Sequence, residues 1–156
     1  MEKTLIILKP DALQRGLAGR ILTRFEEKGF TVVALKAMQV SRSLAEKHYA
    51  VHKGKPFYDR LIQYITSSPV VVMVLEAVGA IAVARKMMGA TFGSKAEPGT
   101  IRGDFGLSNS FNLIHGSDSP EAAAFEIGLY FKPDELLKPD RAIERWVFDT
   151  SGGAPE

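Results

Sequence analysis

Apolar residues follow two patterns along the chain, and each pattern predicts one kind of element. Short apolar runs predict buried strands. They occur at residues 4–8, 30–40, 70–75 and 112–115. Apolar residues at helical spacing predict helices between and after these strands. We expect the helices at residues 17–28, 43–51, 57–65, 80–88 and 120–131.

Residues that cap or stop helices mark several of these boundaries. Gly29 and Gly89 stand where C-terminal caps belong, and Pro120 occupies a first helical position. Ser43 and Glu46 form a capping-box pattern, which predicts that the 43–51 helix begins there. Without the minor helices, the element order is β-α-β-β-α-β.

This order favours an α+β fold, a ferredoxin-like β-α-β-β-α-β sandwich with an antiparallel sheet and extra helices packed on it. The length of 156 residues fits one domain. We expect that domain to span residues 1–150, and residues 151–156 to form a short loose tail.

Composition excludes several classes of function. The chain has no cysteine, which rules out disulfides and thiolate metal sites. Its net charge is only +2, so nothing requires nucleic acid as a partner. The apolar run near the start is too short for a signal peptide or a membrane span. We therefore expect no membrane partner and a cytoplasmic location.

The stretch between Gly89 and Phe111 has little periodicity and four internal glycines. Irregular segments of this length in compact domains are usually either functional or disordered. This one contains Thr91 and Arg102 and leads directly to the last predicted strand. We interpret it as a binding loop.

Two of the three histidines, His48 and His52, are four residues apart and could share one helix face, as a metal-binding pair does. No third ligand stands nearby at a suggestive spacing, and a Gly-Lys-Pro break follows His52. A structural or exposed pair is the favoured interpretation.

The third histidine, His115, lies where a strand runs into a turn of small residues and then a helix. Small neighbours let a bulky substrate approach, and the turn and the helix N-terminus suit anions. A neutral imidazole is nucleophilic. Eleven residues on, Glu126 interrupts an apolar run. Its carboxylate could hold one ring nitrogen of His115 and leave the other free to attack.

Five blocks of the chain, in order and spacing, resemble the nucleoside diphosphate kinase family. The resemblance covers about residues 3–148. The blocks are residues 4–11 (TLIILKPD), 45–49 (AEKHY), 55–58 (KPFY), 98–105 (PGTIRGDF) and 112–119 (NLIHGSDS).

The resemblance implies a reversible ping-pong transfer of the γ-phosphate from a nucleoside triphosphate, typically ATP, to a nucleoside diphosphate. His115 would carry the phosphate, with broad tolerance of base and sugar. Phosphoimidazole keeps a high transfer potential, whereas a phosphoester on Ser117 would be a poor donor. Mg²⁺ would arrive with the nucleotide phosphates rather than in a protein cage.

The same resemblance assigns roles to further residues. Those expected to act on the nucleotide are Lys9, Arg85, Thr91 and Arg102 at the phosphates, Asn112 at the sugar and Phe57 at the base. Ser117 and Glu126 are expected beside His115, with Tyr49 and Glu126 supporting Lys9 and His115. A homo-oligomer, either a hexamer or a tetramer, is also implied, with the stretch 135–148 at or near its contacts.

The chain departs from the family pattern at two places. Phe92 and Gly93 stand where the family often has Asn-Pro, and Phe111 stands where a basic residue is common. The first change affects loop rigidity and subunit geometry rather than the chemistry.

Other functions are less well supported. Asp104-Phe105-Gly106 imitates a protein-kinase motif, but no catalytic-loop partner precedes it, and the 93–95 segment is not a P-loop. An RNA-binding module on this scaffold would need exposed aromatics on its strands. A histidine phosphocarrier would share the phosphohistidine, but free nucleoside diphosphates would not discharge it.

Overall fold

The computed structural model describes residues 1–137, 139–140 and 142–156. Four strands form its sheet. They are β1 (Glu2–Leu8), β2 (Thr31–Met38), β3 (Val70–Ala77) and β4 (Ile114–Gly116).

Helices connect the strands and extend beyond them. The α-helices are α1 (Pro10–Gln14), α2 (Ala18–Glu27), α3 (Arg42–His48), α4 (Tyr58–Ile65), α5 (Ala80–Met88), α6 (Ile101–Phe105), α7 (Pro120–Tyr130) and α8 (Glu144–Val147). Short 3₁₀ helices are η1 (Ala50–His52), η2 (Gly93–Lys95) and η3 (Pro133–Glu135).

The strands are ordered β2-β3-β1-β4, and every neighbouring pair is antiparallel. The two earliest strands in sequence are thus separated by β3, as the split β-α-β arrangement requires. This confirms the α+β, ferredoxin-like fold predicted from the pattern. β4 lies at one edge of the sheet, where its His115 stands opposite Ile7 of β1.

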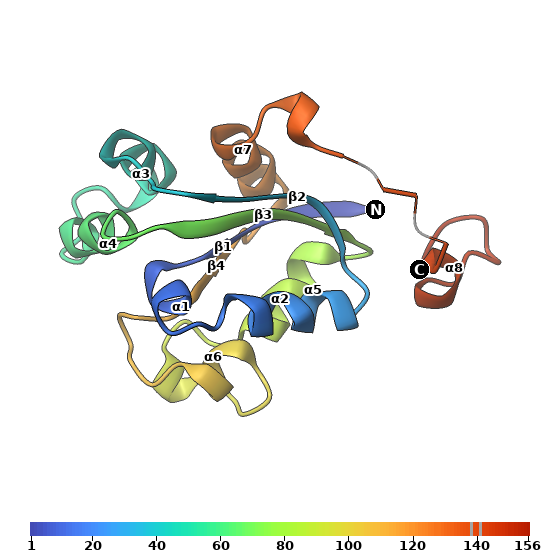
Figure 1. The fold of residues 1–156 in the computed structure, drawn as a ribbon, viewed down its shortest axis with the longest axis horizontal. Helices are drawn as coiled ribbons and strands as arrows, with labels where there is room; N and C mark the ends of the chain where they lie inside the picture. The colour runs from blue at the N-terminus through green and yellow to red at the C-terminus, as the bar shows by residue number, and fades with distance from the viewer. Residues whose placement is uncertain (138, 141) are drawn as a thin grey trace.

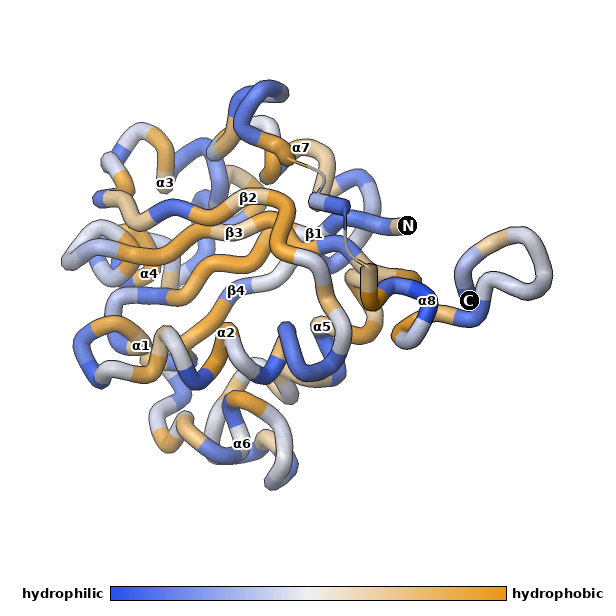
Figure 2. The backbone as a smooth tube through the Cα atoms, turned by 45° about the vertical axis from the view of Figure 1, so that its right-hand side comes forward, coloured by the Kyte–Doolittle hydropathy of each residue, from blue (hydrophilic) through white to orange (hydrophobic). Residues whose placement is uncertain are grey.

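Helices cover both faces of the sheet, as Figure 1 shows, with α3, α4 and α7 on one side and α2, α5 and α6 on the other. Side chains of β1 alternate between the two layers: Leu5 and Ile7 join the first core, and Ile6 and Leu8 join the second. Figure 2 shows the resulting concentration of apolar residues on the strands.

The structure differs from the sequence prediction at both ends of α3 and in one short helix that was not predicted. The cap of α3 is Ser41, whose hydroxyl accepts the Leu44 amide hydrogen, so Ser43 lies inside the helix. That helix ends at His48 and not at Val51, because the chain turns into η1. Helix α1 was missed because five residues are too short to show a helical period.

The fourth strand also begins later than predicted, at Ile114 rather than Asn112. Leu113 has a φ of 67°, in the left-handed region that a leucine rarely adopts, and so interrupts the extended backbone. Two polar contacts hold it there: its amide donates to Asp11 Oδ2 at 3.1 Å, and its carbonyl accepts from the Lys9 amide at 2.8 Å.

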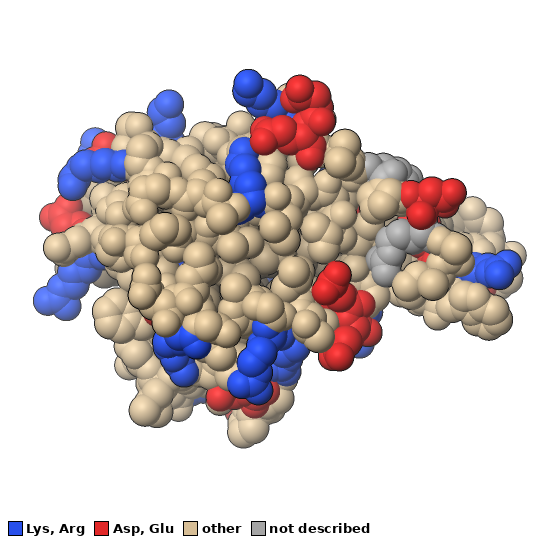
Figure 3. All heavy atoms as spheres, in the orientation of Figure 1, with Lys and Arg blue, Asp and Glu red and all other residues tan. Residues whose placement is uncertain are grey.

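Basic and acidic side chains are interspersed over the face shown in Figure 3, in line with the small net charge. Among the helices in the described residues, none is long and apolar enough to cross a membrane.

Candidate active site

The His115 side chain projects from the middle of β4 and keeps 20% of its surface exposed. Its neighbour Gly116 lets this edge strand lie close to α5: a Cβ at that position would stand 2.6 Å from the sulfur of Met88. A side chain at 116 would have to displace the buried ends of Met88 and Ile6, so the glycine allows the strand that carries the imidazole to pack this closely.

A chain of hydrogen bonds links His115 to Glu126 and Ser117. Nε2 of His115 lies 3.0 Å from Oε1 of Glu126, and the hydroxyl of Ser117 donates to Oε2 at 2.5 Å. Ser117 is itself fixed by β1, because its oxygen accepts the Leu5 amide hydrogen at 3.2 Å. Both carboxylate oxygens of Glu126 therefore have partners.

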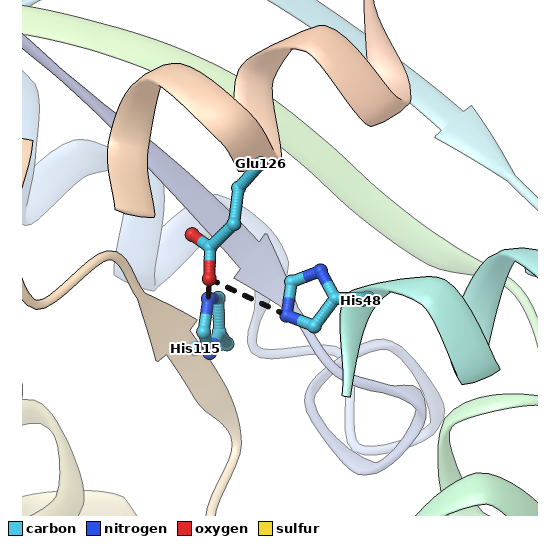
Figure 4. Close-up of side chains that lie close together, drawn as sticks. All are labelled: His48, His115 and Glu126. Carbon is cyan, nitrogen blue, oxygen red and sulfur yellow. Dashed lines mark hydrogen bonds and ion pairs between the residues drawn. The ribbon is translucent and has the colours of Figure 1, made fainter. Parts of the chain in front are cut away.

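Glu126 is buried on α7, so its ionisation state decides what it does to His115. Burial raises the pKa of this carboxyl, but the hydrogen bonds from His115 and Ser117 outweigh burial, and the pKa lies below its ordinary value. An ionised carboxylate only accepts, so the ring proton of a neutral His115 belongs on Nε2. Nδ1 then keeps its lone pair and, in Figure 4, lies on the side of the ring away from Glu126.

Lys9 and Asn112 meet beside this strand. Lys9 Nζ donates to Oδ1 of Asn112 at 2.7 Å, and Nδ2 of Asn112 donates to the Thr91 carbonyl at 3.0 Å. Burial lowers the pKa of Lys9 to about 7, and the charge of Arg102 adds to the effect. Lys9 forms no salt bridge with any of the described residues, and the nearby charge of Asp11 offsets only part of the cost of burying its charged form.

Arg102 is buried on α6 and holds the binding loop against β4. Its guanidinium donates to the carbonyls of Asn112 at 3.1 Å, Gly89 at 3.1 Å and Ile114 at 2.6 Å. Three of its five N–H donors are thereby used inside the protein. Burial and the nearby charge of Arg85 lower the pKa of Arg102 to about 10. Two guanidinium groups therefore repel each other here.

The remaining expected nucleotide-binding residues are exposed. Arg85 reaches the Gly116 carbonyl at 3.4 Å, next to His115, while Thr91 lies at the start of the loop. Phe57 is 48% exposed, and its ring contacts the edge of His52 at a centroid distance of 5.4 Å.

Tyr49 packs against the site. Among the described residues its buried hydroxyl has no hydrogen-bond partner, so the structure shows no bond from it to Lys9. The ring packs edge-on to His48 at 4.4 Å and to His115 at 6.3 Å between centroids. Tyr49 thus contacts the site by packing alone.

The sequence reading missed His48, Asp11 and Tyr64. His48 is buried at the end of α3, with Nε2 3.7 Å from Oε1 of Glu126 and its ring 4.6 Å from that of His115. His52 lies on η1 instead, so the two do not form a ligand pair on one helix face. Asp11 accepts a hydrogen bond from the Tyr64 hydroxyl and fixes Leu113.

The two departures from the family pattern, at Phe92-Gly93 and at Phe111, have structural consequences. The backbone of Gly93 abuts that of Gly106, and a Cβ at 93 would lie 2.3 Å from the Gly106 carbonyl oxygen. The Phe111 ring packs on that of Tyr64 at 5.1 Å between centroids. Each departure is therefore accommodated by contacts within this chain.

Among the residues described, one group of three potential metal ligands occurs, made of His48, His115 and Glu126. Its two imidazoles do not suit Mg²⁺, which takes oxygen ligands. That Mg²⁺ arrives with the nucleotide phosphates stays a prediction.

The chain is similar to known nucleoside diphosphate kinases in both sequence and structure. The family model described as nucleoside diphosphate kinase matches residues 2–136. A nucleoside diphosphate kinase of Thermomicrobium roseum is 58% identical over 94% of this chain and 99% of that protein, and one of Carboxydothermus hydrogenoformans is 56% identical over 96% and 100%. A solved structure of a halophilic nucleoside diphosphate kinase from Halobacterium salinarum in complex with CDP superposes with a TM-score of 0.93, at 48% identity, over 95% of this chain and 99% of that one.

Proposed function

Because this chain belongs to the nucleoside diphosphate kinase family and is a nucleoside-diphosphate kinase, we propose that it works by ping-pong transfer through His115. The γ-phosphate of a nucleoside triphosphate, typically ATP, moves to the imidazole, and a nucleoside diphosphate then takes it up. The reaction is reversible, and the enzyme accepts varied bases and sugars.

One observation carries this proposal: the imidazole of His115 is held through Nε2 by a buried, ionised carboxylate, beside three cationic side chains. Lys9, Arg85 and Arg102 bond to Asn112, Gly116 and Ile114, all within three residues of His115. Without an anion these cations repel one another. A nucleophile aimed at a site for phosphate is the arrangement that phosphoryl transfer requires.

In the first half-reaction, a bond forms between Nδ1 of His115 and the γ-phosphorus. The bond from that phosphorus to the bridging oxygen breaks, and the electron pair leaves on the diphosphate. The ring becomes cationic as Nδ1 is substituted, and the Glu126 carboxylate on Nε2–H stabilises that charge. Ser117 supports the carboxylate from its other side. The second half-reaction reverses these steps with a different diphosphate.

The cations stabilise charge on the transferring oxygens. Lys9 and the two free N–H donors of Arg102 act from the buried side, and Arg85 and Thr91 act from the exposed side. Mg²⁺ would be held by the nucleotide phosphates rather than by residues of this chain, and it would supply neutralisation of the phosphate charge.

The base and sugar contact other residues. The exposed face of Phe57 stacks on the base, and the second amide hydrogen of Asn112 remains for a sugar hydroxyl. A flat apolar face does not distinguish one base from another, which supports broad specificity.

We also propose that the enzyme forms a cytoplasmic homo-oligomer, a hexamer or a tetramer. Large apolar side chains support the assembly because they remain exposed on one subunit. They include Leu35 on the edge strand β2 and, in the 135–148 stretch, Leu137, Ile143 and Trp146.

Labelling tests the proposal directly. The purified chain is incubated with γ-labelled ATP and Mg²⁺ alone, and the label is expected on His115 as an acid-labile, alkali-stable phosphate. Added CDP, GDP or UDP should then remove the label as the triphosphate. A phosphocarrier would keep it, so discharge separates the two functions.

The control is His115→Ala, which removes the imidazole from the edge strand β4. It should take up no label and exchange no phosphate. Acid-stable label on Ser117, or full activity in His115→Ala, would contradict the mechanism.

A further inference from the structure

We propose that His48, His115 and Glu126 form a binding site for Zn²⁺, and that zinc held there switches off phosphate transfer. The binding itself is independent of the proposed function. Only the inhibition rests on it, because His115 serves both as ligand and as nucleophile.

The three side chains come from separate elements and converge on one point. His48 ends α3, His115 lies on β4 and Glu126 lies on α7, as Figure 4 shows. Their ligand atoms all lie within 4.8 Å of one another, with Oε1 of Glu126 at 3.0 Å from Nε2 of His115 and 3.7 Å from Nε2 of His48. Tetrahedral Zn²⁺ with bonds of about 2.0–2.1 Å places its ligands roughly 3.3 Å apart. Side-chain shifts of about 1 Å therefore bring the three ligand atoms to the spacing that the ion requires.

The ligand set points to zinc rather than to magnesium. Two imidazoles and one carboxylate are a known zinc set that leaves a fourth position for water. Mg²⁺ prefers an octahedral shell of oxygens and retains its waters. The Mg²⁺ that accompanies nucleotides therefore competes poorly for this group of ligands.

His48 supplies a second and independent reason. Its side chain is 1% exposed, yet neither ring nitrogen has a hydrogen-bond partner among the residues that the structure describes. Nε2 faces Oε1 of Glu126 at 3.7 Å, which is too long for a hydrogen bond. A buried polar group without a partner costs free energy, and a metal bond to this nitrogen would remove that cost.

Zinc in this site blocks the nucleophile through the tautomer of His115. In the free enzyme the ring proton lies on Nε2 and the lone pair on Nδ1. A metal bond at Nε2 needs the lone pair there, so the remaining proton of a neutral ring moves to Nδ1, which can no longer attack phosphorus. The metal also occupies the Glu126 oxygen that stabilises the cationic ring.

Linkage makes the effect reciprocal. If zinc weakens the phosphorylation equilibrium by some factor, phosphorylation weakens zinc binding by the same factor. Triphosphate in excess should therefore expel the ion, and a chain without a phosphate donor should retain it.

Binding is measured first, without reference to activity. The metal-free chain is dialysed against buffered free Zn²⁺, and wild type is expected to bind one ion per chain. His48→Gln and Glu126→Gln should bind more than about 10-fold more weakly, since loss of even an outer partner of a ligand costs about 10–100-fold. His52→Gln is the matched control, a histidine four residues away that lies outside the group, and it should bind like wild type.

A second measurement needs no variant and so does not depend on whether a variant folds. Substoichiometric Co²⁺ added to the wild-type chain should broaden the ring resonances of His48 and His115 and spare those of His52. Equal broadening of His52, or zinc binding that is unchanged in a folded His48→Gln, would overturn the site.

The switch is tested by phosphoenzyme formation from Mg²⁺-ATP at micromolar free Zn²⁺. Each chain is compared with its own rate in a zinc-selective chelator. Wild type and His52→Gln should slow at least about 10-fold, and His48→Gln should be insensitive. Zinc that binds the group without slowing phosphorylation would overturn the switch. No phosphoenzyme in the chelator would instead overturn the proposed function, while the dialysis still decides the metal site.

Discussion

Two regions of the site are built differently. The catalytic corner, made of His115, Ser117 and Glu126, is bonded through β1, β4 and α7 before any nucleotide arrives. The proposed nucleotide rim, made of Phe57, Arg85 and Thr91, is exposed, and its side chains make few polar contacts with the described residues. Groups that need a fixed geometry during bond-making are thus positioned by the fold. Groups that would receive the nucleotide are left open to it.

Lys9 and Arg102 bond to residues beside His115, and, apart from loss of the nucleophile itself, removing either should have the largest effect. Lys9→Met and Arg102→Met should each lower kcat by about 10²–10³-fold, the scale for loss of a preorganised donor to developing charge. Steady-state kinetics separates this from simple binding. A rise in KM with kcat unchanged would assign both residues to the rim.

The contrast between these cations and the exposed Arg85 was only partly predictable from the sequence. The resemblance named all three, and the sequence placed Lys9 at the end of a predicted strand, Arg85 in a predicted helix and Arg102 in the expected binding loop. Their burial was not predictable: Lys9 next to a proline resembles a solvated strand end, yet tertiary packing buries it. The three internal carbonyls bound by Arg102 likewise depend on a loop conformation that has no periodic signal.

The catalytic corner was also only partly predictable from the sequence. The sheet order, most helices and the pairing of His115 with Glu126 were anticipated, because hydrophobic periodicity and one interrupting carboxylate mark them. His48 was not, because its partners lie 67 and 78 positions away in sequence and no local spacing connects them. Ser41 was also missed as a cap, since Ser43 and Glu46 form an equally good pattern two residues on.

The next largest effect concerns Glu126. Glu126→Gln keeps the shape but can turn its donor end toward His115, and it should slow phosphorylation by roughly 10–100-fold. Nucleotide affinity should change little, because Glu126 does not face the rim. Rapid-quench measurement at several ATP concentrations gives both quantities. An unchanged rate would mean that Glu126 serves only packing.

The rim should discriminate only weakly between nucleotides, and this effect is smaller than that of Glu126→Gln. Stacking on Phe57 is worth roughly 1–3 kcal/mol and tolerates any base. Purine and pyrimidine diphosphates should therefore discharge the phosphoenzyme within about 10-fold of one another, which corresponds to about 1.4 kcal/mol. Strict selection of guanine or adenine would show that the rim carries polar contacts to the base.

A separate effect is on stability, and it concerns Lys9. Its pKa is about 7 in the folded chain and near 10.5 when unfolded. The unfolded chain therefore binds more protons between these values, so the destabilisation by Lys9 is fully present below pH 7 and fades as the pH rises toward 10.5. Lys9→Met should raise the Tm at pH 6 more than at pH 9. Arg102→Met should lower the Tm at both, because it strips donors from three carbonyls.

The central claim, that the fold leaves Nδ1 of His115 free to attack by holding Nε2–H on Glu126, is tested most directly by ¹⁵N NMR of the histidine rings. In the metal-free, nucleotide-free chain, the spectrum should assign the ring proton of neutral His115 to Nε2. After reaction with ATP, coupling to ³¹P should appear at Nδ1. A proton found on Nδ1 in the free enzyme, or phosphorus coupled to Nε2, would contradict the mechanism.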